Sequence, residues 1–384
     1  MGGFTFGSVT LPPEAKAYAE KARAFLREEQ EAGLWKAHRS SWSTFDAGFS
    51  KRAGAAGLIG LTFPTEYGGH GQSSLVRFAV TEEMLAAGAP CGAHWVADRQ
   101  SGPQLLKHGS ERVRREIVPK IAAGECYFGI GMSEPGSGSD LAAVRTKATR
   151  VEDGWRIDGQ KIWTTNAHHA HYLIALVRTG EAGESRHEGL TQMLVDLTSP
   201  GITVRPILDI SGNHEFNEVF FDGVFAPDDH VIGEVGNGWA MVTGELAFER
   251  SGPDRYLSDF RLLAALVDRV GAEPGERQAG EIGRLVTHLV ALRRMSASIA
   301  DSLDRGMEPS TEAALVKEMG NAFEREIPEI ARRLAPVEPD LLAEDDIYVE
   351  GLADVTLRAP CFTLRGGTRE ILRGVIARQL GLRG

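Results

Sequence analysis

Seven short runs with strand-like patterning lie together in the middle of this chain and constrain its fold more than any other feature. They cover residues 127–132, 142–151, 154–162, 171–177, 189–196, 202–207 and 218–224. Many of them alternate apolar and polar residues, and turn sequences such as Glu152-Asp153-Gly154 separate them. Short strands at this spacing predict a compact β-barrel or sandwich.

Helical periodicity precedes and follows this β region. The pattern predicts helices over residues 12–30, 53–59, 76–87 and 111–122 before it, and over 239–250, 256–270, 279–303, 311–334 and 368–380 after it. Helices, then strands, then helices indicate an α+β fold with a β insert. We therefore expect an N-terminal helical domain (residues 1–123), a middle β domain (124–235) and a C-terminal helical domain (236–384).

The composition excludes several classes of protein. The net charge of -11 over 384 residues argues against nucleic-acid binding and against a basic membrane-surface patch. No run reaches the roughly 18 apolar residues of a membrane span, and the N-terminus lacks a secretory signal. The three cysteines form no CxxC pair, which is typical of a reducing compartment. These features predict a cytoplasmic protein.

Two turn-rich segments of the β region carry the candidate chemistry. Residues 132–140 read MSEPGSGSD, where small residues let the backbone approach a pyrophosphate and Ser133 and Ser139 add hydroxyl groups. Residues 159–167 read GQKIWTTNA, where Trp163 can lie against an aromatic ring and Thr165 can bond a ring nitrogen. A tight turn before an ordinary strand is the alternative. Both segments together favour a site for a flavin ring and its phosphates.

These two segments resemble the central signature of the acyl-CoA dehydrogenase family. Residues 64–69 (PTEYGG), 233–239 (GEVGNGW), 368–371 (TREI) and 376–378 (IAR) extend the resemblance over nearly the whole chain. It implies a C-terminal four-helix bundle, FAD as cofactor, an acyl-CoA substrate and an electron-transfer flavoprotein as electron acceptor. The cofactor-binding residues that it implies are Ile130, Met132, Ser133, Gly138, Ser139, Trp163, Thr165, Thr368 and Glu370.

The family reaction is α,β-dehydrogenation, in which a carboxylate takes the α-proton and flavin N5 accepts the β-hydride. Many members carry the glutamate before a Gly-Thr in the C-terminal tail, but this chain has Gly366 there. A second lineage places it before an arginine on the first helix of the third domain, which matches Glu249-Arg250. The resemblance thus implies Glu249 as the base, Arg250 as its orienting group and Gly366 as a backbone N–H donor to the thioester oxygen. A solvated Glu-Arg pair is the alternative.

Two family motifs that reach the flavin of a neighbouring subunit are missing. Residues 270–280 contain no Arg-x-x-Phe-Gly, and residues 334–340 contain no Gln-x-x-Gly-Gly-x-Gly. Either a homo-oligomer holds its cofactor less firmly, or a paralogous subunit supplies the missing groups. The chain resembles the base-carrying subunit of heterotetrameric enzymes of bacterial steroid side-chain breakdown, which implies a bulky or steroid-derived acyl group.

Other functions remain open at this point. The chain could be a catalytically silent subunit that stabilises a paralogue, or a same-fold acyl-CoA oxidase or flavin monooxygenase. His168, His169 and His171 form a cluster that invites a metal, but no cysteine or carboxylate completes a ligand set at a recognised spacing. We expect no metal site and a solvent-facing loop at these histidines.

Overall fold

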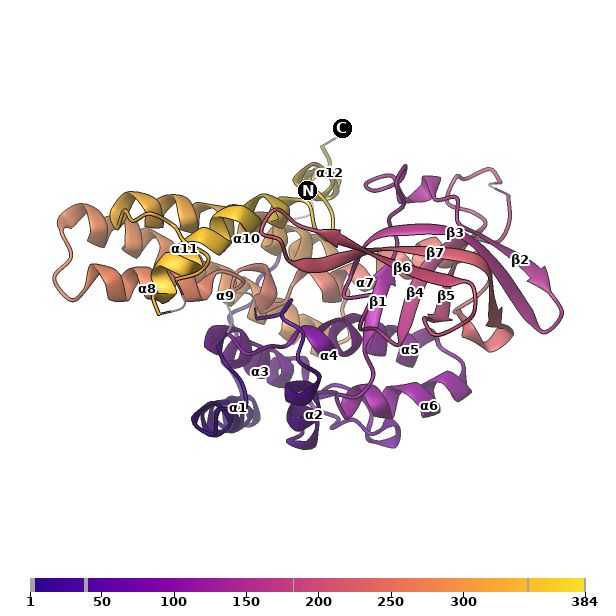
Figure 1. The fold of residues 1–384 in the computed structure, drawn as a ribbon, viewed down its shortest axis with the longest axis horizontal. Helices are drawn as coiled ribbons and strands as arrows, with labels where there is room; N and C mark the ends of the chain where they lie inside the picture. The colour runs from indigo at the N-terminus through magenta and orange to yellow at the C-terminus, as the bar shows by residue number, and fades with distance from the viewer. Residues whose placement is uncertain (1–3, 38–40, 182, 344, 383–384) are drawn as a thin grey trace. The chain divides into compact units, whose positions relative to one another are not determined.

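A computed structural model describes residues 4–37, 41–181, 183–343 and 345–382, and for residues 245–249 it describes the backbone alone. The chain folds as two compact units (Figure 1). The first comprises Met1–Thr44, Ser73–Pro90 and Ala247–Gly384, and the second comprises Phe45–Gln72 and Cys91–Leu246. The division into three domains at residues 123 and 235 stays a prediction.

The second unit is built on one sheet of eight strands. The hydrogen-bonded order is β6-β7-β3-β2-β4-β5-β8, and β1 pairs in parallel with β4 beside this path. The strands are β1 (Phe128–Gly131), β2 (Lys147–Val151), β3 (Gly154–Thr165), β4 (Tyr172–Arg178), β5 (Leu190–Asp196), β6 (Ile202–Leu208), β7 (His214–Pro227) and β8 (Val231–Ile232). All seven predicted runs overlap strands, although the run at 142–151 becomes a strand only from Lys147, after a 3-10 turn at Leu141–Ala143.

The two faces of the sheet bury separate cores. Ile174 and Leu194 pack against helical residues such as Val118 and Ile121. Their neighbours Leu173, Ala175 and Val177 point the other way, because successive side chains of a strand alternate between faces. They pack with residues of β3 and β7, including Ile157, Val219 and Val224. The sheet therefore encloses a core of its own on one side and is covered by helices on the other.

The helices of this unit differ in two places from the pattern-based prediction. They are α2 (Ala47–Ala55), α4 (Gly92–Val96), α5 (Gly102–His108) and α6 (Glu111–Ala122), with a π-helical turn at Ala97–Ser101. The predicted helix at 53–59 is wrong: α2 starts at its Asp46 cap and ends at Ala55, before Gly57 turns left-handed at φ 67°. Helix over 92–108 was not predicted, because glycines, a proline and the π turn disturb its periodicity.

The first unit is helical. It contains α1 (Pro13–Glu31), α3 (Ser74–Ala87), α8 (Phe260–Val270), α9 (Glu276–Asp304), α10 (Ser310–Leu334), α11 (Ile347–Arg358) and α12 (Arg369–Gln379), while α7 (Gly238–Arg250) crosses the boundary between the units. α9 and α10 pack through Ile299, Ala313 and Val316, and α3 joins α9 through Leu75, Phe78 and Ala297. α11 is absent from the sequence-based prediction, and α8 begins four residues later than the predicted 256.

Among the residues that the structure describes, we find no helix whose length and apolar character would let it span a lipid bilayer.

Candidate functional site

The two signature segments lie beside each other in the second unit. The loop 132–140 leaves β1 and closes on itself, since the backbone N–H groups of Glu134 and Ser137 each donate to the carbonyl of the other, at 2.8 and 3.0 Å. The backbone N–H of Ile162 in β3 donates to the carbonyl of Ser133 at 3.0 Å. The structure thus brings the loop and the strand together, as a shared binding site would require.

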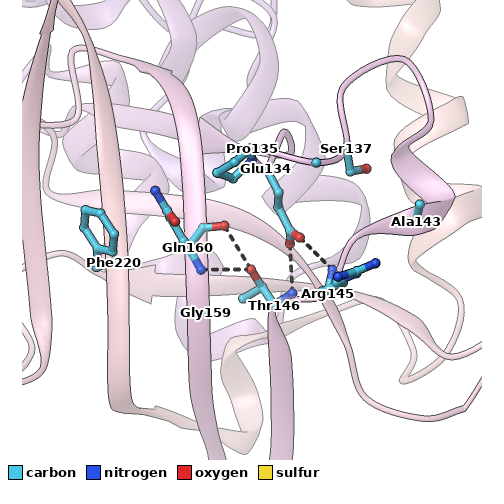
Figure 2. Close-up of a pocket in the computed structure, with 10 residues that line it drawn as sticks. Glu134, Pro135, Ser137, Ala143, Arg145, Thr146, Gly159, Gln160 and Phe220 are labelled. Carbon is cyan, nitrogen blue, oxygen red and sulfur yellow. Dashed lines mark hydrogen bonds between the residues drawn. The ribbon is translucent and has the colours of Figure 1, made fainter.

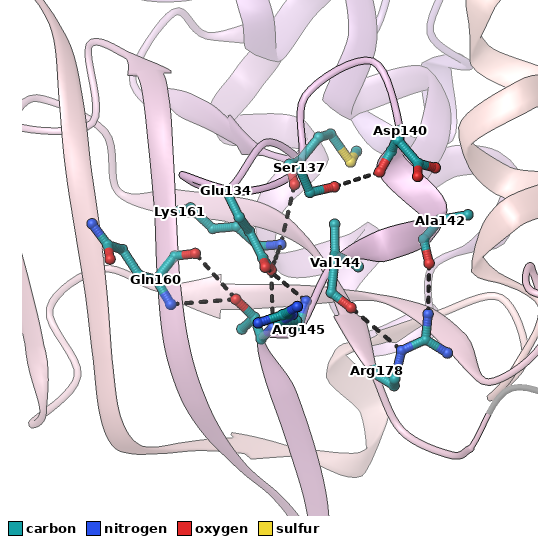
Figure 3. A network of polar contacts seen from close by, with 11 residues as sticks. Glu134, Ser137, Asp140, Ala142, Val144, Arg145, Gln160, Lys161 and Arg178 are labelled. Carbon is teal, nitrogen blue, oxygen red and sulfur yellow. Dashed lines mark hydrogen bonds and ion pairs between the residues drawn. The ribbon is translucent and has the colours of Figure 1, made fainter.

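A buried ion pair fastens this loop to the strand (Figure 3). Lys161 Nζ lies 2.8 Å from Glu134 Oε1, and the two side chains are 0% and 8% exposed. Lys161 also donates to the carbonyl of Met132 at 3.1 Å. The Glu134 carboxylate accepts the backbone N–H groups of Arg145 at 2.7 Å and Thr146 at 2.9 Å. One buried carboxylate therefore connects three segments of chain.

The environment of this pair shifts both pKa values. Burial lowers the pKa of Lys161 to about 8, although the Glu134 charge acts in the opposite direction. Burial would raise the pKa of Glu134, but the Lys161 charge and the hydrogen bonds more than offset it, so the pKa is lowered. Sequence reasoning missed both residues. The available signal was a lysine at an inward-facing position of a strand whose other inward-facing residues include Trp155 and Ile157.

A pocket of about 540 Å³ opens beside the loop (Figure 2). The turn of the loop, the segment that leads into β2, and the strands β3 and β7 line it. The lining residues are Glu134, Pro135, Gly136, Ser137, Ala143, Arg145, Thr146, Gly159, Gln160 and Phe220. Around Gly136 and Gly138, no heavy atom of the described residues would lie within 4 Å of an added Cβ. The loop backbone is thus open to a ligand, with the Arg145 side chain in the wall of the pocket.

Trp163 is held in an unusual backbone conformation. β3 carries one extra residue relative to β7 between Lys161 and Thr164, and within this bulge Trp163 has φ 62°. Such a left-handed conformation is strained for a bulky residue. The indole is 57% exposed and meets Phe216 edge-to-face at 5.9 Å. The strained backbone therefore turns the indole of Trp163 outward. Backbone strain that is kept in a folded protein is typical of a binding site.

The other cofactor candidates of this unit differ in burial. Thr165 is half-buried and lies opposite Phe216 in the sheet. Ile130 and Met132 are partly buried against the core beneath the helices. Ser139 is exposed at the turn of the loop, next to Gly138.

His168, His169 and His171 follow the bulge in a turn, where His169 and His171 are exposed, as predicted, and His168 is half-buried. The His168 ring stacks on His214 at 3.8 Å between ring centroids, and the tilted ring of the exposed His169 lies 4.0 Å from it. Burial, and then the charges of its two neighbours, lower the pKa of His168 to about 4. The described part of the chain holds no group of three or more histidine, cysteine or acidic side chains suited to a metal ion.

In the first unit, the structure joins Arg250 to the tail turn. Arg250 is 5% exposed, and its Nε donates to the carbonyl of Gly366 at 3.3 Å. Gly366 and Gly367 have φ values of 60° and 99°, so the turn requires glycine-like backbone freedom. The backbone of Glu249 lies on the last turn of α7, whereas its side chain is outside the described residues.

Buried charges of α10 support this turn. Lys317 is fully buried, and its Nζ donates to the carbonyl of Gly367 at 3.4 Å. Arg365 pairs with the fully buried Glu324 at 3.1 Å and donates to the Ser258 hydroxyl at 2.9 Å. Burial raises the pKa of Glu324, and the Arg365 charge opposes this shift. Lys317, Glu324 and Arg365 were not predicted from the sequence as residues of the site.

Thr368 and Glu370 have a local structural role. Thr368 is the N-cap of α12, where its hydroxyl accepts the backbone N–H of Ile371 at 3.4 Å. Glu370 is exposed in the first helical turn, where hydrogen bonds to the backbone and to the Thr368 side chain lower its pKa. The start of α12 therefore explains why a threonine and a glutamate occur at these two positions.

Comparison with known proteins identifies the family. Residues 12–125 match the N-terminal domain of acyl-CoA dehydrogenases, and residues 129–224 match the middle domain. The acyl-CoA dehydrogenase IpdE1 of Mycobacterium tuberculosis is 35% identical over 340 residues, which are 87% of this chain and 87% of that protein. A mitochondrial isovaleryl-CoA dehydrogenase of Solanum tuberosum is 28% identical, over 97% of this chain and 92% of its own.

A solved structure described as "Tcur3481-Tcur3483 steroid ACAD" superimposes with a TM-score of 0.84 and 26% identity, covering 98% of this chain and 100% of that one. The predicted α+β fold, with helical, sheet and helical segments in that order, is confirmed by these matches. The chain therefore belongs to the acyl-CoA dehydrogenase family of oxidoreductases, as its two central motifs predicted.

Proposed function

We propose that this chain uses FAD to dehydrogenate a bulky acyl-CoA thioester, with Glu249 as the base that removes the α-proton. Acyl-CoA dehydrogenation in general follows from the family. The observation that carries the finer proposal is the bond between Arg250 Nε and the Gly366 carbonyl, 3.3 Å long. It connects the end of α7 with the tail turn in which many relatives keep their glutamate.

Position 366 is a glycine and cannot accept a proton from substrate. The carboxylate of Glu249, one residue before Arg250 in the sequence, is the alternative base that we propose. A base of this kind needs a pKa raised by a dry environment, because an exposed glutamate is too weak. The 5% exposure of Arg250 supports such an environment at the end of α7. Arg250 would orient the base, and the N–H of Gly366 would bind the thioester oxygen.

The residues of the second unit fit FAD. The exposed indole of Trp163, which meets Phe216 edge-to-face, suits a flat aromatic ring system, and Thr165 is the last residue of the same strand. The open loop at Gly136 and Gly138, beside Arg145, suits a pyrophosphate. Bound FAD would supply the acceptor of the β-hydride. The full proposed set is Ile130, Met132, Ser133, Gly138, Ser139, Trp163, Thr165, Thr368 and Glu370.

We further propose a heterotetramer in which a paralogous subunit completes the flavin site. Residues 270–280 and 334–340 lack the motifs that relatives donate to a neighbour. One face of α9 exposes small or apolar residues at helical spacing, namely Gly283, Val286, Thr287, Val290 and Ala291. Such a stripe is suited to packing against a helix of another subunit.

The proposal also covers the acyl group of the substrate and the electron acceptor. The 26% identical structural relative is described by two protein names and as a steroid enzyme, which supports a paired assembly and a steroid-derived acyl group. We expect an electron-transfer flavoprotein to reoxidise the enzyme.

Co-purification tests the assembly. The chain is produced alone and with a paralogous subunit, and flavin absorbance is measured per polypeptide. Little flavin on the isolated chain, restored by the paralogue to half as many flavins as chains, supports the heterotetramer. About one flavin per chain on the isolated protein contradicts it.

Substitution of Glu249 tests the base. Glu249→Gln should lower turnover of short, branched and polycyclic acyl-CoA thioesters by about 10²–10⁴-fold, measured with an artificial electron acceptor, while bound flavin stays constant. Glu245→Gln, one turn earlier on α7, is the matched control and should remain active. Full activity of Glu249→Gln would instead favour another base or a catalytically silent subunit.

A further inference from the structure

The bulge that presents Trp163 is tied to its partner strand by a buried amide. Asn217 in β7 lies opposite Thr164 in the register and is 0% exposed. Its side-chain Nδ2 donates to the carbonyl of Thr164 at 3.0 Å. This carbonyl stands between Trp163, the residue with φ 62°, and Thr165. The amide therefore bonds the backbone at the point where the extra residue interrupts the regular ladder.

Two histidines lie against the oxygen end of this amide. Asn217 Oδ1 lies 3.1 Å from His168 Nδ1 and 2.7 Å from His214 Nε2. Because the Thr164 carbonyl can only accept, the amide nitrogen must face it and the amide oxygen must face the imidazoles. Each imidazole then presents an N–H to the same oxygen. Their stacking at 3.8 Å keeps both donors beside the amide oxygen, which leaves the amide nitrogen to face the Thr164 carbonyl.

We propose that Asn217 is a positioning residue for the flavin. Through the Thr164 carbonyl it maintains the left-handed bulge that directs Trp163 and Thr165 toward the ring, and His168 and His214 hold its amide in the required orientation. This inference rests on the proposed function, since it assigns Asn217 a role in the same FAD site. Asn217 itself acts through the backbone of β3 and contacts no cofactor in this role.

The sharpest test is Asn217→Asp. The carboxylate keeps the shape of the amide and still accepts from both histidines, but it cannot donate to the Thr164 carbonyl. Loss of this one hydrogen bond should weaken FAD binding by about tenfold and reduce the quenching of flavin fluorescence by Trp163. The measurement uses the chain with its paralogous subunit if that subunit is needed to hold flavin. Asn213→Asp, the same change at an exposed position of the β6–β7 turn, should leave both quantities unchanged.

A readout without cofactor separates this inference from the proposed function. In the apo protein, hydrogen exchange of the peptide spanning residues 161–166 should be about tenfold faster in Asn217→Asp than in the wild type. If the wild type binds no FAD in any assembly, the proposed function fails, whereas the exchange result still decides whether Asn217 holds the bulge. A lower Tm with unchanged exchange, FAD affinity and quenching would reduce Asn217 to a packing residue and overturn the inference.

A second variant applies if Asn217→Asp does not fold. His168→Ala removes one of the two donors to the amide oxygen from a half-buried position. It should move the same readouts in the same direction by a smaller factor. Unchanged exchange and unchanged quenching in His168→Ala would contradict the role given to the histidines and to Asn217.

Discussion

Breaking the ion pair between Lys161 and Glu134 should destabilise the second unit more than breaking any exposed pair on the same strand. Lys161→Met keeps the apolar stem but leaves the Glu134 carboxylate buried at 8% exposure without its cation. Removing one partner of a buried pair costs about 3–5 kcal/mol. Because the backbone N–H groups of Arg145 and Thr146 still reach this carboxylate, we expect about 3 kcal/mol, at the low end of that range.

Glu134→Gln should cost more, because either orientation of the amide places an NH₂ group against a backbone N–H. The free energy of unfolding is measured by urea titration at pH 7, followed by tryptophan fluorescence. The double variant should be less destabilised than the sum of the single variants by about 2 kcal/mol, the coupling expected of residues in one network. Arg156→Met on the same strand removes an exposed pair with Asp158, at 3.6 Å, and should cost less than about 1 kcal/mol.

Additivity of the two single variants within about 0.5 kcal/mol would show that Lys161 and Glu134 act independently and would refute this reasoning. A cost for Lys161→Met as small as that of Arg156→Met would refute it as well, since burial would then make no difference. Flavin bound per chain, measured on the same samples, tests whether the pair also holds the loop 132–140 in its binding conformation.

Three further predictions concern the site. Burial lowers the pKa of Lys161 from 10.5 to about 8, so between these pH values the unfolded chain keeps a proton that the folded chain has released. The free energy of unfolding should therefore rise with pH, by up to about 1.4 kcal/mol per pH unit. Urea titrations from pH 7.5 to 10.5 should show this rise in the wild type and its loss in Lys161→Met. Trp163→Gly should be more stable than Trp163→Ala by about 1 kcal/mol, because only glycine adopts φ 62° without strain, and the opposite order in thermal unfolding would contradict the assigned conformation. Gly367→Ala places a Cβ 3.0 Å from Arg250 Nη2 at φ 99°, so it should lower turnover and should lower stability by about 1–2 kcal/mol. Gly374→Ala in α12 has open space among the described residues and should stabilise the helix by up to about 1 kcal/mol. Equal Tm values for the two variants would argue against the tight turn at Gly367.

Most of the fold was predictable because it depends on local patterns. Amphipathic periodicity placed α1, α6, α9 and α10 within a few residues, and alternation placed the strands. The errors fall where local signals conflict. The helical stretch at 92–108 contains a π turn and two glycines, and α11 follows an acidic segment that is typical of a loop. In both regions tertiary packing stabilises helix despite weak periodicity.

The candidate site was predictable only in part. The residues of the two motifs, the glycine at position 366 and the Glu249-Arg250 pair are visible in the sequence because they are residue types at a recognised spacing. Asn217 carries no such signal, since a buried asparagine in a strand reads as an ordinary polar residue until its partners are known. Its role emerges from hydrogen bonds to residues 49 and 53 positions away along the chain.

The sequence by itself determined the family, the order of helical and β segments and the absence of a carboxylate at position 366, because each depends on residue identity over short stretches. Only the tertiary structure decided that Lys161 neutralises Glu134, that Trp163 adopts a left-handed conformation and that Arg250 bonds the Gly366 carbonyl. These features depend on strand register, on the extra residue of a bulge and on contacts across more than 100 residues in the case of Arg250. A change of register by one residue would turn Lys161 and its neighbours to the opposite face, so no local pattern specifies them.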